Sequence, residues 1–142
     1  MKEVHILLIE DNEGDVILTL EAFEESRIKT RISVVKTGKE ALDFLFRNGE
    51  YENAERPDLI LLDINIPVYN GLEVLQKVKK DSILKKIPVI MLTTSSNQKD
   101  INTAYEYHAN SYVSKPMEMD EFLKAILKIE EFWLQLSKLA KD

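Results

Sequence analysis

Cysteine is absent from the 142 residues, and histidine occurs only twice. The absence of cysteine excludes disulfides, thiol chemistry and cysteine-based zinc sites. Long apolar runs are also missing, because no segment approaches the ~20 residues needed to cross a bilayer. The apolar run that begins at Val4 lacks a small-residue cleavage site and is followed at once by acidic residues, so we interpret it as a strand rather than a signal peptide. We therefore expect a cytoplasmic protein that makes no contact with membranes.

Basic residues are also fewer than acidic ones. The chain carries 19 Lys and Arg residues against 25 Asp and Glu, a formal net charge of −6 that repels nucleic acid on average. The densest basic cluster surrounds the end of one predicted helix, where lysines match the helix dipole and are expected to be solvated. It consists of Lys77, Lys79, Lys80, Lys85 and Lys86. The length fits one domain over residues 1–142, so we expect no separate DNA-binding domain.

Short apolar runs alternate with amphipathic segments along the whole chain. Near-continuous apolar runs such as 59–62 are typical of parallel strands that are covered on both faces. The predicted strands are 4–9, 31–35, 59–62, 89–93 and 111–114. Helical periodicity and capping residues predict helices at 14–25, 38–48, 71–80, 98–107 and 119–140. This alternation predicts an α/β fold, a doubly wound five-stranded parallel sheet with right-handed crossovers.

Polar side chains directly follow or end four of the predicted strands. The first strand leads into Glu10 and Asp11, the third into Asp63, the fourth ends at Thr93, and the fifth leads into Lys115. In a sheet of strand order 2-1-3-4-5, the first and third strands are neighbours at the switch point, where open α/β sheets bind ligands. The three carboxylates should then converge on one pocket, flanked by a hydroxyl and an ammonium.

Each of these residue types suits phosphoryl transfer. Clustered carboxylates repel one another unless a cation shares the site or protons stay bound, and hard oxygen ligands select Mg²⁺, with Mn²⁺ as an alternative. A carboxylate can serve as the nucleophile for a phosphoryl group. An acidic residue after a strand is often no more than a helix cap, but the coincidence at four strand ends of one sheet favours a phosphoryl-transfer site.

The residues at these strand ends resemble those of the receiver domain of bacterial and archaeal two-component response regulators. The resemblance covers residues 4 to about 127, and it implies a flavodoxin-like fold followed by a helical extension over about 128–140. It rests on the motifs Glu10-Asp11-Asn12, Leu62-Asp63-Ile64-Asn65-Ile66-Pro67, Gly71, Leu92-Thr93-Thr94-Ser95 and Tyr112-Val113-Ser114-Lys115-Pro116.

The resemblance implies a phosphoacceptor and a metal site. Asp63 would be the nucleophile that takes a phosphoryl group from a sensor histidine kinase and forms an acyl phosphate. Asp11, Asp63 and the backbone carbonyl of Asn65 would ligate Mg²⁺. Glu10 stands where many relatives carry Asp, so its contact with the ion is open between direct and water-mediated.

The resemblance also implies a switch. Lys115 would pair with the phosphoryl group, Thr93 would move onto it, and Tyr112 would turn inward as Thr93 moves. The peptide bond before Pro116 would be cis. The face formed by the fourth helix, fifth strand and fifth helix would then signal to an unidentified downstream protein. The alternative is that the protein serves only as a phosphate sink, which removes phosphoryl groups from its kinase without signalling onward.

A narrower resemblance concerns the partner kinase. The opening stretch Glu10-Asp11-Asn12-Glu13-Gly14-Asp15 and the C-terminal Phe132-Trp133 look like those of stand-alone regulators that are paired with phytochrome-type kinases. We therefore expect a phytochrome-like sensor kinase as one partner. His5 and His108 are isolated from each other, and we expect a structural role for both.

Two other classes of protein are compatible with parts of this pattern. A phosphatase of the haloacid-dehalogenase type also uses an Asp nucleophile and Mg²⁺, but it carries that Asp at the end of the first strand with a second Asp two residues later. Here Asp11 is followed two residues on by Glu13, which argues against that class. A phosphate-independent adaptor would lack one of the pocket residues, and none is missing.

The predicted C-terminal helix is longer than one small domain needs. Over 119–140 it would measure ~33 Å at 1.5 Å per residue, and its apolar period includes Phe132, Trp133 and Leu136. Either this segment folds back on its own domain or it packs on another chain. We favour a partner surface, most simply that of a symmetric homodimer.

Overall fold

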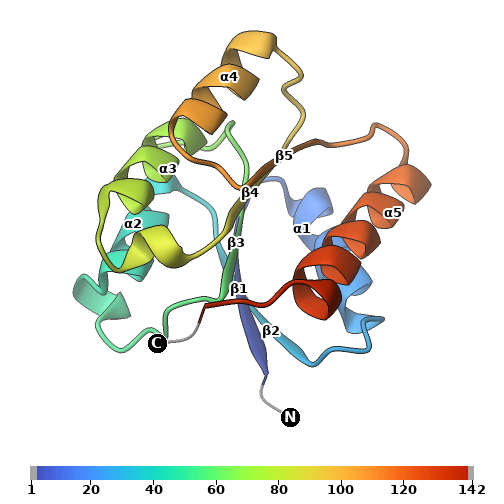
Figure 1. Ribbon diagram of the computed structural model, residues 1–142, viewed down its shortest axis with the longest axis horizontal. Coiled ribbons are helices and arrows are strands. Elements are labelled where there is room, and N and C mark those ends of the chain that lie inside the picture. Colours follow the sequence, from blue (N-terminus) through green and yellow to red (C-terminus); the bar gives the residue numbers. More distant parts are fainter. Residues whose placement is uncertain (1–2, 141–142) are drawn as a thin grey trace.

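A parallel five-stranded sheet forms the centre of the computed structural model, which describes residues 3–140 (Figure 1). The strand order is β2-β1-β3-β4-β5, as predicted. The strands are β1 (Val4–Ile9), β2 (Thr30–Val35), β3 (Leu59–Leu62), β4 (Val89–Thr93) and β5 (Ser111–Ser114). The second strand begins one residue earlier than predicted, because Thr30 pairs with Val4 of β1.

The predicted helices are all present, although most of them end earlier than expected. They are α1 (Glu13–Glu24), α2 (Gly38–Phe46), α3 (Gly71–Lys80), α4 (Gln98–Glu106) and α5 (Met119–Glu130), and a 3₁₀ turn, Gly49–Tyr51, follows α2. The side chain of Asn12 caps α1 by accepting a hydrogen bond from the backbone of Asp15, and Asn70 caps α3 in a capping box with Glu73. The helix α2 stops before Arg47, which takes a left-handed φ of 59°. No helix within residues 3–140 combines the length and the apolar character needed to cross a bilayer.

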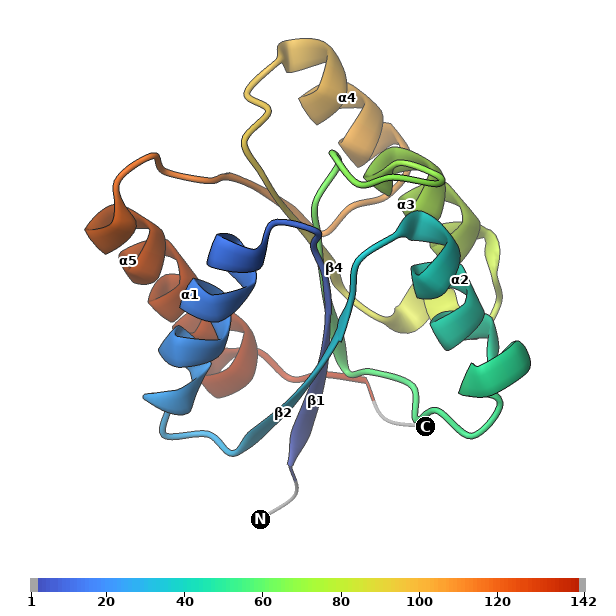
Figure 2. The ribbon, with the colours of Figure 1, turned by 180° about the vertical axis from the view of Figure 1, so that it is seen from behind.

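The helices form two layers around the sheet. Figures 1 and 2 show α1 and α5 on one face and α2, α3 and α4 on the other. Alternate residues along each strand feed two separate cores, so that Leu7 and Ile9 pack toward α2 and α3 while Ile6 and Leu8 pack toward α1 and α5. Burial of both faces is the physical reason for the near-continuous apolar runs in the sequence.

The C-terminal segment differs from the single long helix that was predicted. After α5 the chain continues as a π-helical segment, Glu131–Leu136, and it leaves the helix at Ser137 rather than at residue 140. In Figure 1 the chain then crosses beneath the sheet toward the side of α2 and α3, where Ala140 and Pro57 line the same small pocket. The buried carboxylate of Glu130 marks the change of helix type, because it accepts hydrogen bonds from Ser26 at 2.5 Å and Gln135 at 3.0 Å.

Gly71 fixes the start of α3 against the end of β3, next to the predicted nucleophile. Its N–H donates to the carbonyl of Ile64 at 2.9 Å, and a Cβ at this position would lie 2.1 Å from the carbonyl oxygen of Asp63. Only glycine therefore allows this approach of helix and strand.

We predict that Gly71→Ala lowers the free energy of unfolding by about 1–3 kcal/mol, because the methyl group forces backbone atoms apart. Urea unfolding would measure the change. Gly14→Ala is the matched control, since a Cβ there would meet only a side-chain oxygen, at 3.3 Å, and this variant should lose less stability than Gly71→Ala. Equal stability of the two variants would contradict the packing argument.

Candidate functional site

The carboxyl ends of four strands bring the predicted site residues together. Because β1 and β3 are hydrogen-bonded neighbours, Glu10 and Asp11 lie beside Asp63. The next strands, β4 and β5, carry Thr93 and Lys115 to the same edge of the sheet, where the backbone N–H of Lys115 donates to the carbonyl of Thr93 at 2.7 Å. The structure therefore places all five residues in one site at the switch point of the sheet.

Three carboxylates form the acidic part of the site. One oxygen from each of Glu10, Asp11 and Asp63 lies within 4.8 Å of the other two. The side chains of Glu10 and Asp63 are buried, whereas Asp11 is exposed at the mouth of the site. Asp63 also accepts a hydrogen bond from the backbone N–H of Asn65 at 3.1 Å. This donor set consists of hard oxygen atoms and suits Mg²⁺ or Mn²⁺.

The ammonium group of Lys115 neutralises part of this negative charge. It donates hydrogen bonds to Glu10, to Asp63 at 3.0 Å and to Asp15 at 2.8 Å. Burial alone would lower the pKa of Lys115, but the hydrogen bonds to Asp15 and Glu10 and the nearby negative charges outweigh burial and raise that pKa. Lys115 therefore stays charged at every physiological pH.

The pKa values of the two buried carboxylates are shifted in opposite directions. Burial raises the pKa of Glu10 to about 7, although the hydrogen bond from Lys115 opposes this shift. Burial acts on Asp63 too, but there the hydrogen bond from the Thr93 hydroxyl and the charge of Lys115 dominate and lower its pKa. Asp63 is therefore the carboxylate that remains ionised and available as a nucleophile near neutral pH.

Thr93 and Tyr112, the predicted switch pair, are connected through Ser95. The side chain of Thr93 is fully buried, and its hydroxyl accepts a hydrogen bond from the backbone N–H of Ser95 at 3.4 Å. The hydroxyl of Tyr112 donates to the carbonyl of Ser95 at 2.8 Å, and its half-buried ring packs against the core on the α2–α3–α4 face. A movement of Thr93 would thus be transmitted along a short hydrogen-bonded path to Tyr112.

One site prediction is wrong, and one residue was missed. No peptide bond among residues 3–140 is cis, so the bond before Pro116 is trans, the isomer that prolyl bonds favour by about 0.5–1 kcal/mol. The missed residue is Asp15, which holds the ammonium of Lys115. Its signal in the sequence is its position three residues after Asn12, the N-cap of α1, which places Asp15 in the first turn of the helix that follows the acidic end of β1.

Comparisons with known proteins agree with this geometry. Residues 6–127 match the family model described as the response regulator receiver domain. Response regulator Rcp1 of Synechocystis sp. is 43% identical over 130 residues, which cover 92% of this chain and 88% of Rcp1. The structure of the phosphorylated cyanobacterial phytochrome response regulator RcpA is 42% identical with a TM-score of 0.97, covering 99% of this chain and 100% of that one. The Mn²⁺-bound form of Rcp1 is 41% identical with a TM-score of 0.95, covering 97% and 99%.

The chain therefore belongs to the response regulator receiver domain family. It is a signalling protein of a two-component system, whose family partner is a histidine kinase. Its acidic cluster provides the kind of site at which receiver domains bind Mg²⁺.

The raised pKa of Glu10 predicts that metal binding depends on pH. A protonated Glu10 must lose its proton when a divalent cation binds. Because the folded-state pKa is about 7, we predict that Mg²⁺ affinity rises with pH up to about 7 and is constant above it. The slope below pH 7 should be at most about tenfold per pH unit.

Calorimetric Mg²⁺ titrations in buffers of different ionisation enthalpy would measure both the affinity and the released proton. Glu10→Gln is the matched control, because it keeps the size of the side chain and removes the titrating group. Equal pH dependence in the two proteins would show that Glu10 does not supply the proton.

Proposed function

We propose that this protein accepts a phosphoryl group from the phosphohistidine of a sensor histidine kinase on Asp63, in a Mg²⁺-dependent reaction. The observation that carries the proposal is the buried, ionised carboxylate of Asp63 between an acidic metal site and the ammonium of Lys115. An oxygen of Asp63 attacks the phosphorus in line, the P–N bond to histidine breaks, and an acyl phosphate forms.

The metal site follows from the same geometry. Asp11, Asp63 and the backbone carbonyl of Asn65 would hold Mg²⁺, with Mn²⁺ as a substitute, and Glu10 would support the ion directly or through water. When bound, the ion neutralises charge that develops on the phosphoryl oxygens.

Lys115 has to change partners during the reaction. It is shared among three carboxylates at rest, and one of them, Asp63, loses its charge when it becomes an acyl phosphate. The ammonium then pairs with a phosphoryl oxygen, and Asp15 competes for it from the first turn of α1. Asp15 is thus a positioning residue that holds Lys115 at the mouth of the site in the resting state.

The switch converts this chemistry into a change of surface. Thr93 leaves Asp63 to donate its hydrogen bond to the phosphoryl group, and the shift passes through Ser95 to Tyr112, which turns inward. The α4–β5–α5 face changes shape as a result, and a downstream protein recognises it. Phosphorylation biases this equilibrium only through its differential interaction with the two states.

The partner kinase is proposed to be phytochrome-like, because the similar structure RcpA is a phytochrome response regulator. The protein would act in the cytoplasm, where such a kinase has ATP for its own phosphorylation. The catalytic role of the chain is limited to its own phosphorylation and dephosphorylation, unlike that of a phosphatase with turnover.

The proposal predicts stoichiometric transfer. A histidine kinase labelled with ³²P on histidine should transfer at most one phosphoryl group per chain, and only in the presence of Mg²⁺. Asp63→Asn should accept none, because the amide is not a nucleophile. Continuous release of many phosphates per chain would instead support the phosphatase, and no transfer would support the phosphate-independent adaptor.

Thr93→Ala is the matched control for the switch, because it retains Asp63 and should still accept the label. The NMR signals of Tyr112 should shift on phosphorylation in the native protein and stay in place in the variant. Equal shifts in both proteins would remove Thr93 and Tyr112 from the switch.

We also propose that the C-terminal segment forms a homodimer. Phe132 and Leu136 are 50% and 73% exposed one helical turn apart, and together with Lys128 they line a hollow of about 420 Å³. Trp133 points instead toward the core between α1 and α5, so the surface for the partner is narrower than the sequence indicated.

Phe132→Asp combined with Leu136→Asp should convert the dimer into a folded monomer, because two carboxylates would have to be buried in the interface. Multi-angle light scattering measures the mass, and circular dichroism checks the fold. Ile17→Asp is the control, since Ile17 is an equally exposed apolar residue on α1. An unchanged mass in the double variant would refute this interface.

A further inference from the structure

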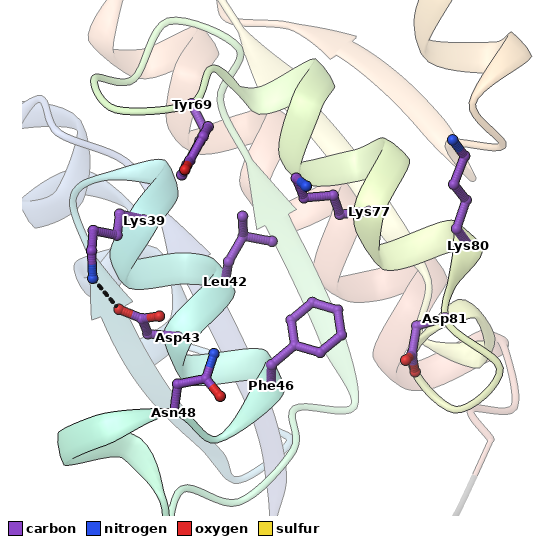
Figure 3. Close-up of a pocket in the computed structure, with 9 residues that line it drawn as sticks. All are labelled: Lys39, Leu42, Asp43, Phe46, Asn48, Tyr69, Lys77, Lys80 and Asp81. Atoms are coloured by element: carbon purple, nitrogen blue, oxygen red, sulfur yellow. Dashed lines mark hydrogen bonds and ion pairs between the residues drawn. The ribbon is translucent and has the colours of Figure 1, made fainter.

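A groove of about 540 Å³ lies between α2 and α3, and neither the residues of the phosphorylation site nor those of α4, β5 and α5 line it. Figure 3 shows Leu42 and Phe46 projecting from α2 toward α3, with Tyr69 at one end of the groove and Asp81 near the other. The function proposed above uses none of these side chains.

The groove has apolar side chains that water still reaches. Phe46 is 39% exposed and Tyr69 is 47% exposed, and both lie beside Leu42. Single exposed apolar residues are ordinary on a protein surface, but an aromatic pair gathered in one groove is typical of an interaction site.

The residues that line the groove include three lysines and two aspartates, so positive side chains outnumber negative ones. The carboxylate of Asp43 is paired with Lys39 at 2.7 Å, and that of Asp81 accepts hydrogen bonds from two backbone N–H groups of the following turn, at 3.0 and 2.8 Å. Lys77 and Lys80 take part in no ion pair with any residue of the described part of the chain. A protein of net charge −6 thus has two lysines without an ion-pair partner in the described part of the chain among the residues that line this groove.

The wall that carries Tyr69 is held in place by the backbone. Val68 and Tyr69 both have left-handed φ angles, 50° and 66°, which non-glycine residues rarely adopt. The N–H of Gly38 donates to the carbonyl of Pro67 at 2.9 Å, and a Cβ on Gly38 would lie 2.0 Å from the carbonyl oxygen of Tyr69. A groove whose wall is already ordered loses little conformational entropy when a ligand binds.

We propose that this groove is a docking site for an acidic amphipathic helix of a partner protein. Apolar side chains of that helix pack on Leu42, Phe46 and Tyr69, and its carboxylates face Lys77 and Lys80. The nine residues of α2 span about 13 Å, so the groove takes two to three turns of the ligand. From the sequence, these two lysines were expected only to be solvated at the end of a helix, whereas the proposal gives them a part in binding a partner. Binding in this groove does not depend on phosphorylation of Asp63.

A synthetic helical peptide tests the proposal. The probe has about fourteen residues, with Leu, Phe and Leu at positions i, i+4 and i+7 and glutamate on the flanking positions. Titrated into the ¹⁵N-labelled, unphosphorylated protein, it should shift the backbone signals of residues 39–48, 68–70 and 77–81. We expect a Kd below about 1 mM.

Two variants should abolish these shifts. Phe46→Ala removes the aromatic floor, and Lys77→Glu combined with Lys80→Glu reverses the charge at the rim, so each should weaken binding at least about tenfold. Lys99→Glu combined with Lys124→Glu is the matched control, because it changes the net charge equally from exposed positions on α4 and α5. Circular dichroism checks that every variant is folded.

The other outcomes overturn the proposal. Absence of shifts at 1 mM peptide, equal binding of a peptide with lysine in place of glutamate, or equal weakening by the control variant would exclude a site for acidic helices. A lower mass in solution for Phe46→Ala, with no peptide bound by the native protein, would show that a second copy of this chain occupies the groove. Because all measurements use unphosphorylated protein, they are independent of the test of Asp63.

Discussion

The ammonium group of Lys115 lies in contact with the carboxylates of Glu10, Asp15 and Asp63, and the rest of the site depends on this charge balance. A buried carboxylate pair would otherwise have to take up protons, because two like charges in a poorly solvated pocket raise each other's pKa. The lysine and the Thr93 hydroxyl keep the pKa of Asp63 low, while burial leaves that of Glu10 near 7. One carboxylate is therefore prepared for nucleophilic attack, and the site still has room for the charge of a divalent cation.

The parallel sheet brings these residues together through short connections. Parallel strands end at one edge of the sheet, so residues that are about fifty positions apart, such as Asp63 and Lys115, meet without a long loop. The glycine at position 71 lets α3 start directly behind the nucleophile, where a Cβ would collide with the carbonyl of Asp63. The carbonyl of Thr93 accepts a hydrogen bond from the N–H of Lys115, which ties the proposed switch residue and the proposed phosphate-binding residue to the same pair of strands.

The strands and the five strand-end residues could be predicted from sequence, because two-sided burial leaves continuous apolar runs and polar residues interrupt them at the strand ends. The strand order is what the resemblance to receiver domains implies. Asp15 was missed because its partner, Lys115, is one hundred positions away, and only the tertiary fold brings the first turn of α1 and the loop after β5 together. The helix predicted over 119–140 is α-helical only to Glu130 and π-helical to Leu136. Ser26 and Gln135 bind the carboxylate of Glu130 where the helix type changes, and no periodicity of apolar residues reports such contacts. The geometry of the Pro116 peptide bond and the groove between α2 and α3 likewise depend on backbone positions that the side-chain pattern does not encode.

The central claim is that Asp63 is the phosphoacceptor, and intact-mass spectrometry after incubation with acetyl phosphate tests it most directly. The account predicts a single adduct of ~80 Da, the mass of one added phosphoryl group, that requires Mg²⁺ and is absent from Asp63→Asn. An adduct that persists in Asp63→Asn would place the acceptor on another residue. The absence of any adduct on the native protein, with both acetyl phosphate and a phosphorylated kinase as donors, would contradict the account.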